Sequence, residues 1–465
     1  MKLSLPELRT KTVHFIGIGG AGMSGIARIM LSQGITVSGS DAKDSPVLAG
    51  LASLGAKTFV GHAAMNLGSS EVLVVSSAID IGNPELIAAQ AKKLIILGRA
   101  EALALLMSES TSIAIAGTHG KTTTTSMLTV ALQSAGMDPS FAIGGMINSA
   151  GTNAHSGTGK VFVAEADESD GSFVAYQPVG AIVTNIEWDH VDHFPDYDSV
   201  LQAFQEFVNS IQPAGFLVAC TDSPGVQQLL ASIARTDIRI ITYGAQGEYS
   251  FAQLSLGAQE SKARITRNGR VLGELAIPVP GEHNVMNALA TIAAGVEVGA
   301  PVASLFEGLS NFSGARRRFE LKGMAHGIRV IDDYGHHPTE VMVTLTAARR
   351  YAGTGKVIAI FQPHRYSRTQ AFTQEFAQTL SLADKVFLLE VYPAGEASIP
   401  GVSALNIAQL MDSHVAVFQP SMIEVVEQIL ELAKPGDVIF TLGAGDVNSL
   451  APVILTSLAE KYPQE

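Results

Sequence analysis

The sequence predicts a three-domain α/β protein: a Rossmann-like N-terminal domain, a central P-loop domain with a mainly parallel sheet, and a Rossmann-like C-terminal domain. Short β-branched runs alternate with helical stretches from end to end, which is typical of parallel strands joined by crossover helices. The length of 465 residues corresponds to about three domains of about 150 residues each. Polar stretches at residues 108–111 and 313–315 suggest the boundaries, so we expect domains over residues 1–107, 108–314 and 315–465.

The composition restricts the classes of partner. The formal net charge is −13 and 47% of the residues are apolar, which argues against nucleic acid and membrane surfaces and predicts large apolar cores. No apolar run approaches the ~20 residues of a membrane span, and the first residues lack the apolar region of a signal peptide. The single cysteine, Cys220, excludes an internal disulfide and suits a reducing compartment. We therefore expect a cytoplasmic enzyme of small-molecule substrates, as a monomer or a homodimer.

The first glycine loop indicates a nucleotide site in the N-terminal domain. A predicted strand at residues 13–16 leads into this loop, and a second strand at residues 36–40 ends at Asp41. An acidic residue about 20 positions after such a loop can hold a ribose hydroxyl. The pattern alone leaves the nucleotide open, so a nicotinamide-dependent oxidoreductase is one alternative. The candidate binding residues are Gly17, Gly19, Gly20, Ala21, Gly22, Met23, Ser24 and Asp41.

The second glycine loop indicates phosphate binding in the central domain. It stands between a predicted strand at residues 112–115 and a helical stretch at residues 124–132. Its backbone N–H groups and the helix N-terminus attract an anion. Lys121 can reach the outer phosphates and Thr122 can ligate Mg²⁺. The usual pattern has a further glycine where Ile115 stands, so the loop is shortened; a plain strand–helix turn is the alternative. The loop residues are Gly117, Thr118, His119, Gly120, Lys121, Thr122 and Thr123.

Acidic and imidazole groups follow the next two predicted strands. Glu165 ends the strand at residues 161–164, where a hard carboxylate suits Mg²⁺. Asp167, Glu168 and Asp170 follow it, and a solvated loop is the alternative for these three. His190 comes after the strand at residues 181–184, so we expect Glu165 and His190 to converge on one phosphate pocket, with His190 acting partly through water. A loop histidine without ligands is the alternative.

Two further features face the same predicted site. Asn284 and Asn287 are three residues apart at the start of a helix and therefore share a face. Amide contacts with a nucleotide base or ribose are one reading, and an N-cap with a surface amide is the other. Arg318 ends a triple arginine just after the predicted hinge. Domain closure could deliver its charge to a γ-phosphate, although a solvated patch is the alternative.

Polar clusters at two strand ends indicate a second substrate site in the C-terminal domain. Residues 332–340 follow one predicted strand and residues 362–368 follow another. Arg365 could hold a substrate carboxylate with two parallel hydrogen bonds. Crossover-loop polarity is the alternative, and these clusters argue against a nucleotide-switched interaction protein.

With these motifs the sequence resembles the Mur ligase family, the ATP-dependent amide-forming ligases of peptidoglycan synthesis. The shortened loop at residues 117–123 is similar to that family's P-loop, and the match spans all three predicted domains. Residues in matching contexts are Glu165, His190, Asn284, Asn287, Arg318 and Asp333. The resemblance implies a central ATPase domain, between a nucleotide-sugar domain and an amino-acid domain.

Within the family, the branch that adds L-alanine to UDP-N-acetylmuramate is most similar. The similarity lies in residues 17–24, 165–170, 332–338 and 362–368. It implies ATP, UDP-N-acetylmuramate and L-alanine as substrates, Mg²⁺ as cofactor, and UDP rather than NAD on the first glycine loop. Several related ligases carry a carbamylated lysine some fifteen residues past His190, and no lysine lies between Trp188 and Phe216 here. A tripeptide-recycling ligase that also uses UDP-N-acetylmuramate is the alternative.

The resemblance also implies residue roles. Lys121, Glu165, His190, Arg318 and Asp333 are the expected catalytic residues, and Thr122, Glu165 and His190 the expected metal ligands. ATP is expected to bind at residues 117–123, Asn284, Asn287, Arg318 and Asp333, with Asp333 ordering the ribose or the hinge. The expected alanine-binding residues are Tyr334, His336, His364 and Arg365.

Overall fold

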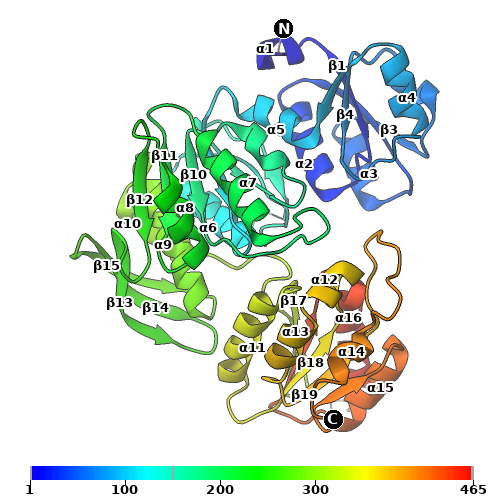
Figure 1. Ribbon diagram of the computed structural model, residues 1–465, viewed down its shortest axis with the longest axis vertical. Coiled ribbons are helices and arrows are strands. Elements are labelled where there is room, and N and C mark those ends of the chain that lie inside the picture. The colour runs from blue at the N-terminus through cyan, green and yellow to red at the C-terminus, as the bar shows by residue number, and fades with distance from the viewer. Residues whose placement is uncertain (1–2, 149–150, 462–465) are drawn as a thin grey trace.

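The computed structural model describes residues 3–148 and 151–461. Three sheets, each covered by helices, form three lobes along the chain, coloured blue, green, and yellow to red in Figure 1. This arrangement confirms the predicted α/β fold of three domains with mainly parallel sheets. The boundaries after residues 107 and 314 stay predictions. Within the described residues, no helix combines the length and apolar character that crossing a bilayer requires.

The N-terminal sheet has five parallel strands in the order β3-β2-β1-β4-β5. The order reverses at β1, and ligands of open α/β sheets bind beyond the carboxyl ends of the strands at such a point. The loop that starts at Gly17 follows β1 there. The strands are β1 (Thr12–Ile16), β2 (Thr36–Asp41), β3 (Lys57–Val60), β4 (Val72–Val75) and β5 (Ile95–Gly98). The helices are α1 (Leu5–Leu8), α2 (Ala21–Ser32), α3 (Pro46–Ser53), η1 (Ala64–Leu67), α4 (Pro84–Ala91) and α5 (Arg99–Met107).

The central sheet has ten strands in the order β15-β14-β13-β12-β11-β10-β6-β9-β7-β8. Its strands from β12 to β7 are parallel, and β8, β14 and β15 join in antiparallel fashion. The strand β6 lies between β9 and β10, so the loops after these three strands meet at one edge. The strands are β6 (Thr111–Ala116), β7 (Ser140–Ala142), β8 (Ala154–His155), β9 (Val161–Glu165), β10 (Gly180–Val183), β11 (Phe216–Cys220), β12 (Arg239–Tyr243), β13 (Tyr249–Leu256), β14 (Ser261–Arg267) and β15 (Arg270–Ile277).

Local sequence explains where the central helices begin. Asp196 accepts a hydrogen bond from the backbone N–H of Ser199, and Ser223 precedes Pro224 at the first position of a helix; both are favoured N-terminal arrangements. The helices are α6 (Lys121–Ser134), η2 (Ser172–Tyr176), α7 (Tyr197–Asn209), α8 (Pro224–Ser232), α9 (Glu282–Glu297) and α10 (Val302–Ser310).

The C-terminal sheet has six strands in the order β16-β17-β21-β18-β19-β20, parallel except for β16. Its central strands are buried along their whole length, as their apolar runs predict. The strands are β16 (Glu320–Ala325), β17 (Ile328–Asp333), β18 (Val357–Phe361), β19 (Lys385–Leu388), β20 (Ala416–Phe418) and β21 (Val438–Leu442). The helices are α11 (Pro338–Ala352), α12 (Tyr366–Ala371), α13 (Thr373–Leu380), α14 (Ala404–Ala408), α15 (Met422–Leu432), η3 (Asp446–Ser449) and α16 (Leu450–Lys461).

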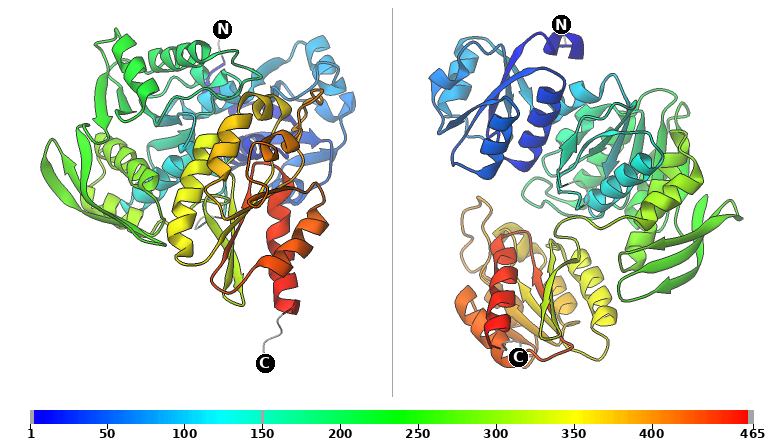
Figure 2. Two further views of the ribbon diagram at one scale, coloured as in Figure 1. Left: turned by 60° about the horizontal axis from the view of Figure 1, so that its bottom comes forward. Right: turned by 180° about the vertical axis from the view of Figure 1, so that it is seen from behind.

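The apolar cores join the domains unequally. One continuous core includes Leu103 of α5 and Phe173 of η2, so the N-terminal and central domains are packed together through apolar side chains. Separate cores fill the two faces of the C-terminal sheet. Trp188 and Val191, from the loop after β10, pack on one of these cores. Figure 2 shows the C-terminal lobe from two further sides. The loop after β10 is therefore a link between the central and C-terminal domains.

Candidate active site

Two glycines shape the loop between β6 and α6. Gly117 and Gly120 have positive φ angles of 132° and 84°. A Cβ atom on Gly117 would overlap Oγ1 of Thr184, and one on Gly120 would lie 2.9 Å from Oδ1 of Asn287. Both positions therefore require glycine. The helix α6 begins at Lys121 directly after the loop, so the loop has the geometry of a phosphate-binding turn.

The Lys121 side chain is held over this loop. Its Nζ donates to the carbonyl oxygens of Gly117, at 2.8 Å, and Thr118, at 3.2 Å. It also forms an ion pair of 2.8 Å with Oε1 of Glu168. Glu168 is only 1% exposed, and burial raises its pKa to about 7 although the Lys121 charge opposes that shift. The ammonium group thus lies at the mouth of the anion site, balanced by a buried carboxyl.

Carboxylate, hydroxyl and imidazole groups gather beside Lys121. Oγ1 of Thr122 donates to Oε1 of Glu165 at 3.0 Å. One ligand atom each from Asp167, Glu168 and His190 lies within 4.8 Å of the other two. Burial lowers the pKa of His190, which favours its neutral, ligating form. The structure thus groups Glu165 with Thr122, and His190 with Asp167 and Glu168.

A cavity of 690 Å³ opens next to the P-loop, between the central and C-terminal domains. Its wall carries Asn284 and Asn287, each 7% exposed, from the first turns of α9. Apolar side chains of Met286 and Phe312 also line it. The predicted ATP residues Gly120, Thr123, Arg318 and Asp333 face the same cavity. A space of this size, apolar with a few polar groups, suits a nucleotide.

Arg318 and Asp333 mark the hinge side of this cavity. The guanidinium of Arg318 lies 3.4 Å from Oε1 of Glu340. Asp333 accepts hydrogen bonds from the backbone N–H groups of Phe319, at 2.7 Å, and Gly335, at 2.8 Å. Burial raises the pKa of Asp333 to about 6. The Asp333 carboxyl therefore ties the segment after the hinge to the end of β17.

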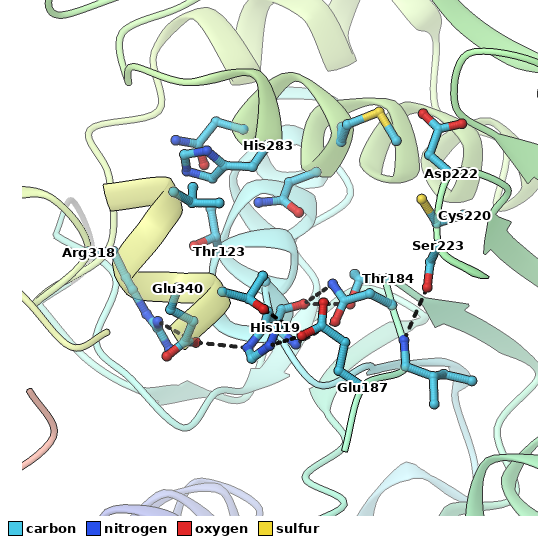
Figure 3. A pocket seen from close by; sticks show the side chains of 18 of the residues that line it. His119, Thr123, Thr184, Glu187, Cys220, Asp222, Ser223, His283, Arg318 and Glu340 are labelled. Carbon is cyan, nitrogen blue, oxygen red and sulfur yellow. Dashed lines mark hydrogen bonds and ion pairs between the residues drawn. The ribbon is translucent and has the colours of Figure 1, made fainter. Parts of the chain in front are cut away.

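His119 connects the P-loop to two carboxylates from different domains. Its Nε2 lies 3.3 Å from Oε2 of Glu187, and its Nδ1 lies 3.3 Å from Oε1 of Glu340. Figure 3 shows His119 between these two side chains. Burial alone would lower the pKa of His119, but the two carboxylates outweigh it and raise the pKa to about 9. Oγ1 of Thr339 donates to Glu187 at 2.6 Å, so the polar contact crosses the domain interface.

The N-terminal glycine loop borders a second cavity. The backbone N–H of Gly19 donates to Oδ2 of Asp41 at 2.9 Å, which fixes the loop against the end of β2. Ala21 and Gly22 line a cavity of 330 Å³ that Arg99, Glu165 and Asp170 also line. This cavity therefore runs from the predicted UDP-sugar loop to a predicted metal ligand. The remaining loop residues lie around the start of α2: Gly17, Gly20, Met23 and Ser24.

The predicted alanine residues come together in part. The ring of His336 lies 5.3 Å from that of Tyr334 and 6.0 Å from that of His364. Arg365 instead pairs with Asp192 of the central domain and lies 3.7 Å from Glu396. The three rings form one group, with Arg365 next in sequence to His364.

A buried ion pair crosses the interface nearby. Nε and Nη2 of Arg368 each lie 2.8 Å from Oδ1 of Asp189, and both side chains are less than 5% exposed. Oδ1 of Asp189 also accepts from the backbone N–H of His190 at 2.7 Å. The C-terminal domain thus holds the residue next to a predicted metal ligand.

Comparison with known proteins gives this geometry its context. Three family models match in succession: "Mur ligase family, catalytic domain" over residues 12–111, "Mur ligase middle domain" over residues 115–295, and "Mur ligase, glutamate ligase domain" over residues 317–445. A UDP-N-acetylmuramate–L-alanine ligase of Renibacterium salmoninarum is 49% identical over 447 residues, or 96% of each chain. The chain belongs to the Mur ligase family.

Further relatives of this Mur ligase include one from Acidothermus cellulolyticus with the same name, 47% identical over 98% of this chain and 97% of that one. Among solved structures, the UDP-N-acetylmuramate–alanine ligase of Thermotoga maritima is 30% identical, with a TM-score of 0.81 over 97% of this chain and 100% of that chain. A murein peptide ligase of Psychrobacter arcticus is 26% identical, with a TM-score of 0.70 over 96% and 98%. These matches support neither the oxidoreductase nor the nucleotide switch.

Two alternatives from the sequence are wrong, and some contacts were missed. Glu168 is buried rather than part of a solvated loop, because it pairs with Lys121. Gly281, not Asn284, is the N-cap of α9, and Asn287 is not a surface amide.

Sequence reasoning did not single out Glu187, Asp189, Glu340 and Arg368. Their only signal was a place in the same polar strand-end segments as the predicted residues.

Proposed function

We propose that this Mur ligase joins L-alanine to the carboxylate of UDP-N-acetylmuramate, with ATP converted to ADP and phosphate. The observation that carries the proposal is the pair of cavities. One cavity borders the UDP-sugar loop and Glu165 at the end of β9. The other borders the P-loop at Gly120 together with Asn284 and Asn287. Relatives that are 46–49% identical over nearly the whole chain carry this activity in their names.

The reaction has two steps. A muramoyl carboxylate oxygen attacks the γ-phosphorus of ATP, the bond to the β-phosphate oxygen breaks, and ADP leaves. The nitrogen of L-alanine then attacks the acyl carbon, loses a proton, and the tetrahedral intermediate expels phosphate. Lys121 and Arg318 balance the negative charge of the transferred phosphoryl group, and the P-loop backbone positions it.

The residues beside the P-loop fit Mg²⁺. Oε2 of Glu168 is buried and has no hydrogen-bond partner among the described residues, and oxygen donors of this kind suit a hard cation. Thr122, Glu165 and the cluster of Asp167, Glu168 and His190 would hold it. When bound, Mg²⁺ neutralises phosphate charge. Asn284 and Asn287 seat the nucleotide, and Tyr334, His336, His364 and Arg365 bind L-alanine.

A panel of acceptors tests the proposal. Phosphate release is measured with UDP-N-acetylmuramate and ATP against L-alanine, glycine, L-serine, other amino acids and the recycled tripeptide. We expect L-alanine to give the highest kcat/KM, with glycine and L-serine poorer by about 10–200-fold, because a pocket discriminates one small group only weakly. A higher kcat/KM for the tripeptide would make this enzyme a recycling ligase.

The reaction substrates and the lone buried thiol also support a cytoplasmic location.

A further inference from the structure

A second set of metal-binding side chains lies at the domain interface, apart from the cluster proposed for Mg²⁺. His119 comes from the P-loop, Glu187 from the loop after β10, and His337 from the N-cap of α11. One ligand atom from each of the three lies within 4.8 Å of the other two. Two imidazoles and one carboxylate are the donors that first-row transition metals prefer, whereas Mg²⁺ prefers oxygen alone.

The distances suit a small tetrahedral ion. Nε2 of His119 and Oε2 of Glu187 are 3.3 Å apart, close to the ~3.3 Å between two ligands that each lie about 2.0–2.1 Å from zinc. Nδ1 of His337 is 3.7 Å from the same Glu187 oxygen. The ring centroids of His119 and His337 are 4.7 Å apart, and the ring planes are tilted by 39°. The donors therefore lie close enough to reach one ion once the side chains rotate toward it.

Outer contacts already orient two of the ligands. Nδ1 of His119 lies 3.3 Å from Glu340, so Nδ1 keeps its proton there, and a bound ion displaces the proton that Nε2 shares with Glu187. A carboxylate behind a histidine in this way is the common outer partner of protein zinc sites. Oγ1 of Thr339 donates to the Glu187 carboxylate at 2.6 Å, which fixes that oxygen.

His337 supplies the third ligand. The residue is 4% exposed, and the ring nitrogen that faces Glu187 is Nδ1. This Nδ1 accepts a long hydrogen bond of 3.3 Å from the backbone N–H of Thr339, and a bound ion would take the place of that hydrogen bond.

We propose that His119, Glu187 and His337 form a binding site for a divalent transition-metal ion, of which Zn²⁺ is the model, that joins the P-loop to the C-terminal domain. Glu340 is the outer positioning residue of this site. The ion holds the two domains together at the edge of the nucleotide cavity, because His119, Glu187 and Glu340 all line that cavity.

Co²⁺ reports on this site directly through its visible absorption. The full chain is titrated with Co²⁺ in excess Mg²⁺ and without nucleotide, and the stoichiometry is checked by equilibrium dialysis with Zn²⁺. We expect one tightly bound ion per chain with a tetrahedral Co²⁺ spectrum, and an unfolding temperature that rises with Zn²⁺. His337→Asn keeps a helix-capping side chain and should weaken binding at least tenfold. Glu340→Gln should weaken binding by about 10–100-fold.

The control variants separate this site from the others. His190→Asn removes the imidazole of the other cluster, and His414→Asn changes an exposed histidine of the C-terminal domain; both should bind Co²⁺ like the parent. If circular dichroism shows that His337→Asn is not folded, Glu187→Gln tests the same site from the central domain. Absence of Co²⁺ binding, or unchanged binding in His337→Asn and Glu187→Gln, or loss in His190→Asn alone, overturns the proposal.

Discussion

At the scale of single residues, Lys121 shows how the protein balances the charge of a lysine in its phosphate-binding loop. Its ammonium bonds two carbonyl oxygens of its own loop and a buried carboxyl of Glu168. Glu168 has a pKa raised to about 7 by burial, so this buried carboxyl can become neutral by protonation when the lysine is removed. The same property allows the fold to tolerate loss of the lysine.

Lys121→Ala should therefore abolish turnover in a folded protein. A group that balances charge in the transition state typically contributes about 2.7–4 kcal/mol, or a factor of ~10²–10³ in rate. Steady-state phosphate release measures kcat, and circular dichroism checks the fold. Lys322→Ala, on the exposed strand β16, is the matched control and should leave kcat unchanged. A Lys121→Ala enzyme within about threefold of the parent would contradict the P-loop assignment.

His119 should make stability depend on pH. Its folded pKa of about 9 exceeds the ordinary value near 6.5. Between these values the native state binds more protons than the unfolded chain, so the stabilisation is complete below pH 6.5 and is lost as pH rises through 9. The effect is about 1–3 kcal/mol. Thermal unfolding from pH 6 to 10 with transition metals chelated measures it. His119→Asn should flatten the profile and His414→Asn should not; parallel profiles for His119→Asn and the parent would count against the pairing.

At the scale of elements, the site follows from strand order. The strand β6 lies between β9 and β10, so Thr122, Glu165 and His190 are brought to one edge of the sheet from three separate segments. Each group sits just beyond a strand end, where backbone and solvent leave room for a ligand.

Glu165→Gln and His190→Ala should each raise the Mg²⁺ concentration required for half-maximal activity. Each change removes a donor beside the P-loop. Phosphate release as a function of Mg²⁺ at saturating substrates tests this, with Glu206→Gln on α7 as the control carboxylate. Unchanged Mg²⁺ curves in both variants would leave these residues with a structural role only.

The glycine loop after β1 should control one nucleotide and not the other. A Cβ atom on Gly19 would lie 2.8 Å from Oδ2 of Asp41, the carboxylate that holds the loop. Gly19→Val should therefore weaken UDP-N-acetylmuramate binding at least about tenfold and leave ATP binding nearly unchanged. Calorimetric titration of each ligand measures this, with Gly50→Ala on α3 as the control. Equal loss of both affinities would indicate misfolding.

Elements were predictable from sequence where the pattern was local. The strands β1, β6, β9 and β10 lie where their apolar runs indicated, and α6 and α9 begin within the predicted polar motifs. The pairing of Lys121 with Glu168 was not predictable, because an acidic run after a strand is as often solvated. The contacts of Glu187 with Thr339, and of Asp189 with Arg368, depend on how two domains meet. The partners are 152 and 179 positions apart, so no local sequence pattern indicates these contacts.

At the scale of the whole molecule, the domains are joined in two different ways. An apolar core unites the N-terminal and central domains. The C-terminal domain instead meets the loop after β10 through ion pairs as well as Trp188 and Val191. Motion of the C-terminal domain would therefore rearrange charges near Lys121 and leave the UDP-sugar loop in place.

Arg365→Lys tests whether this domain brings the amino acid. The change keeps the charge but removes the planar fork that binds a carboxylate. We expect the KM for L-alanine to rise far more than the KM for ATP or the UDP-sugar, as steady-state kinetics with each substrate varied would show. Arg349→Lys, an exposed arginine of the same domain paired with Asp384, is the control. A rise in the KM for ATP alone would place nucleotide, not alanine, at this loop.

The two ion pairs across the interface should respond differently to ionic strength. Arg365 and Asp192 are about one-third exposed, whereas Arg368 and Asp189 are less than 5% exposed. Salt screens charges in water over ~8 Å at physiological concentration but screens buried pairs far less. Added salt thus loosens Arg365 from Asp192 while Arg368 keeps the domains in register. The guanidinium expected to bind alanine then keeps only its longer contact with Glu396, and the molecule does not have to open.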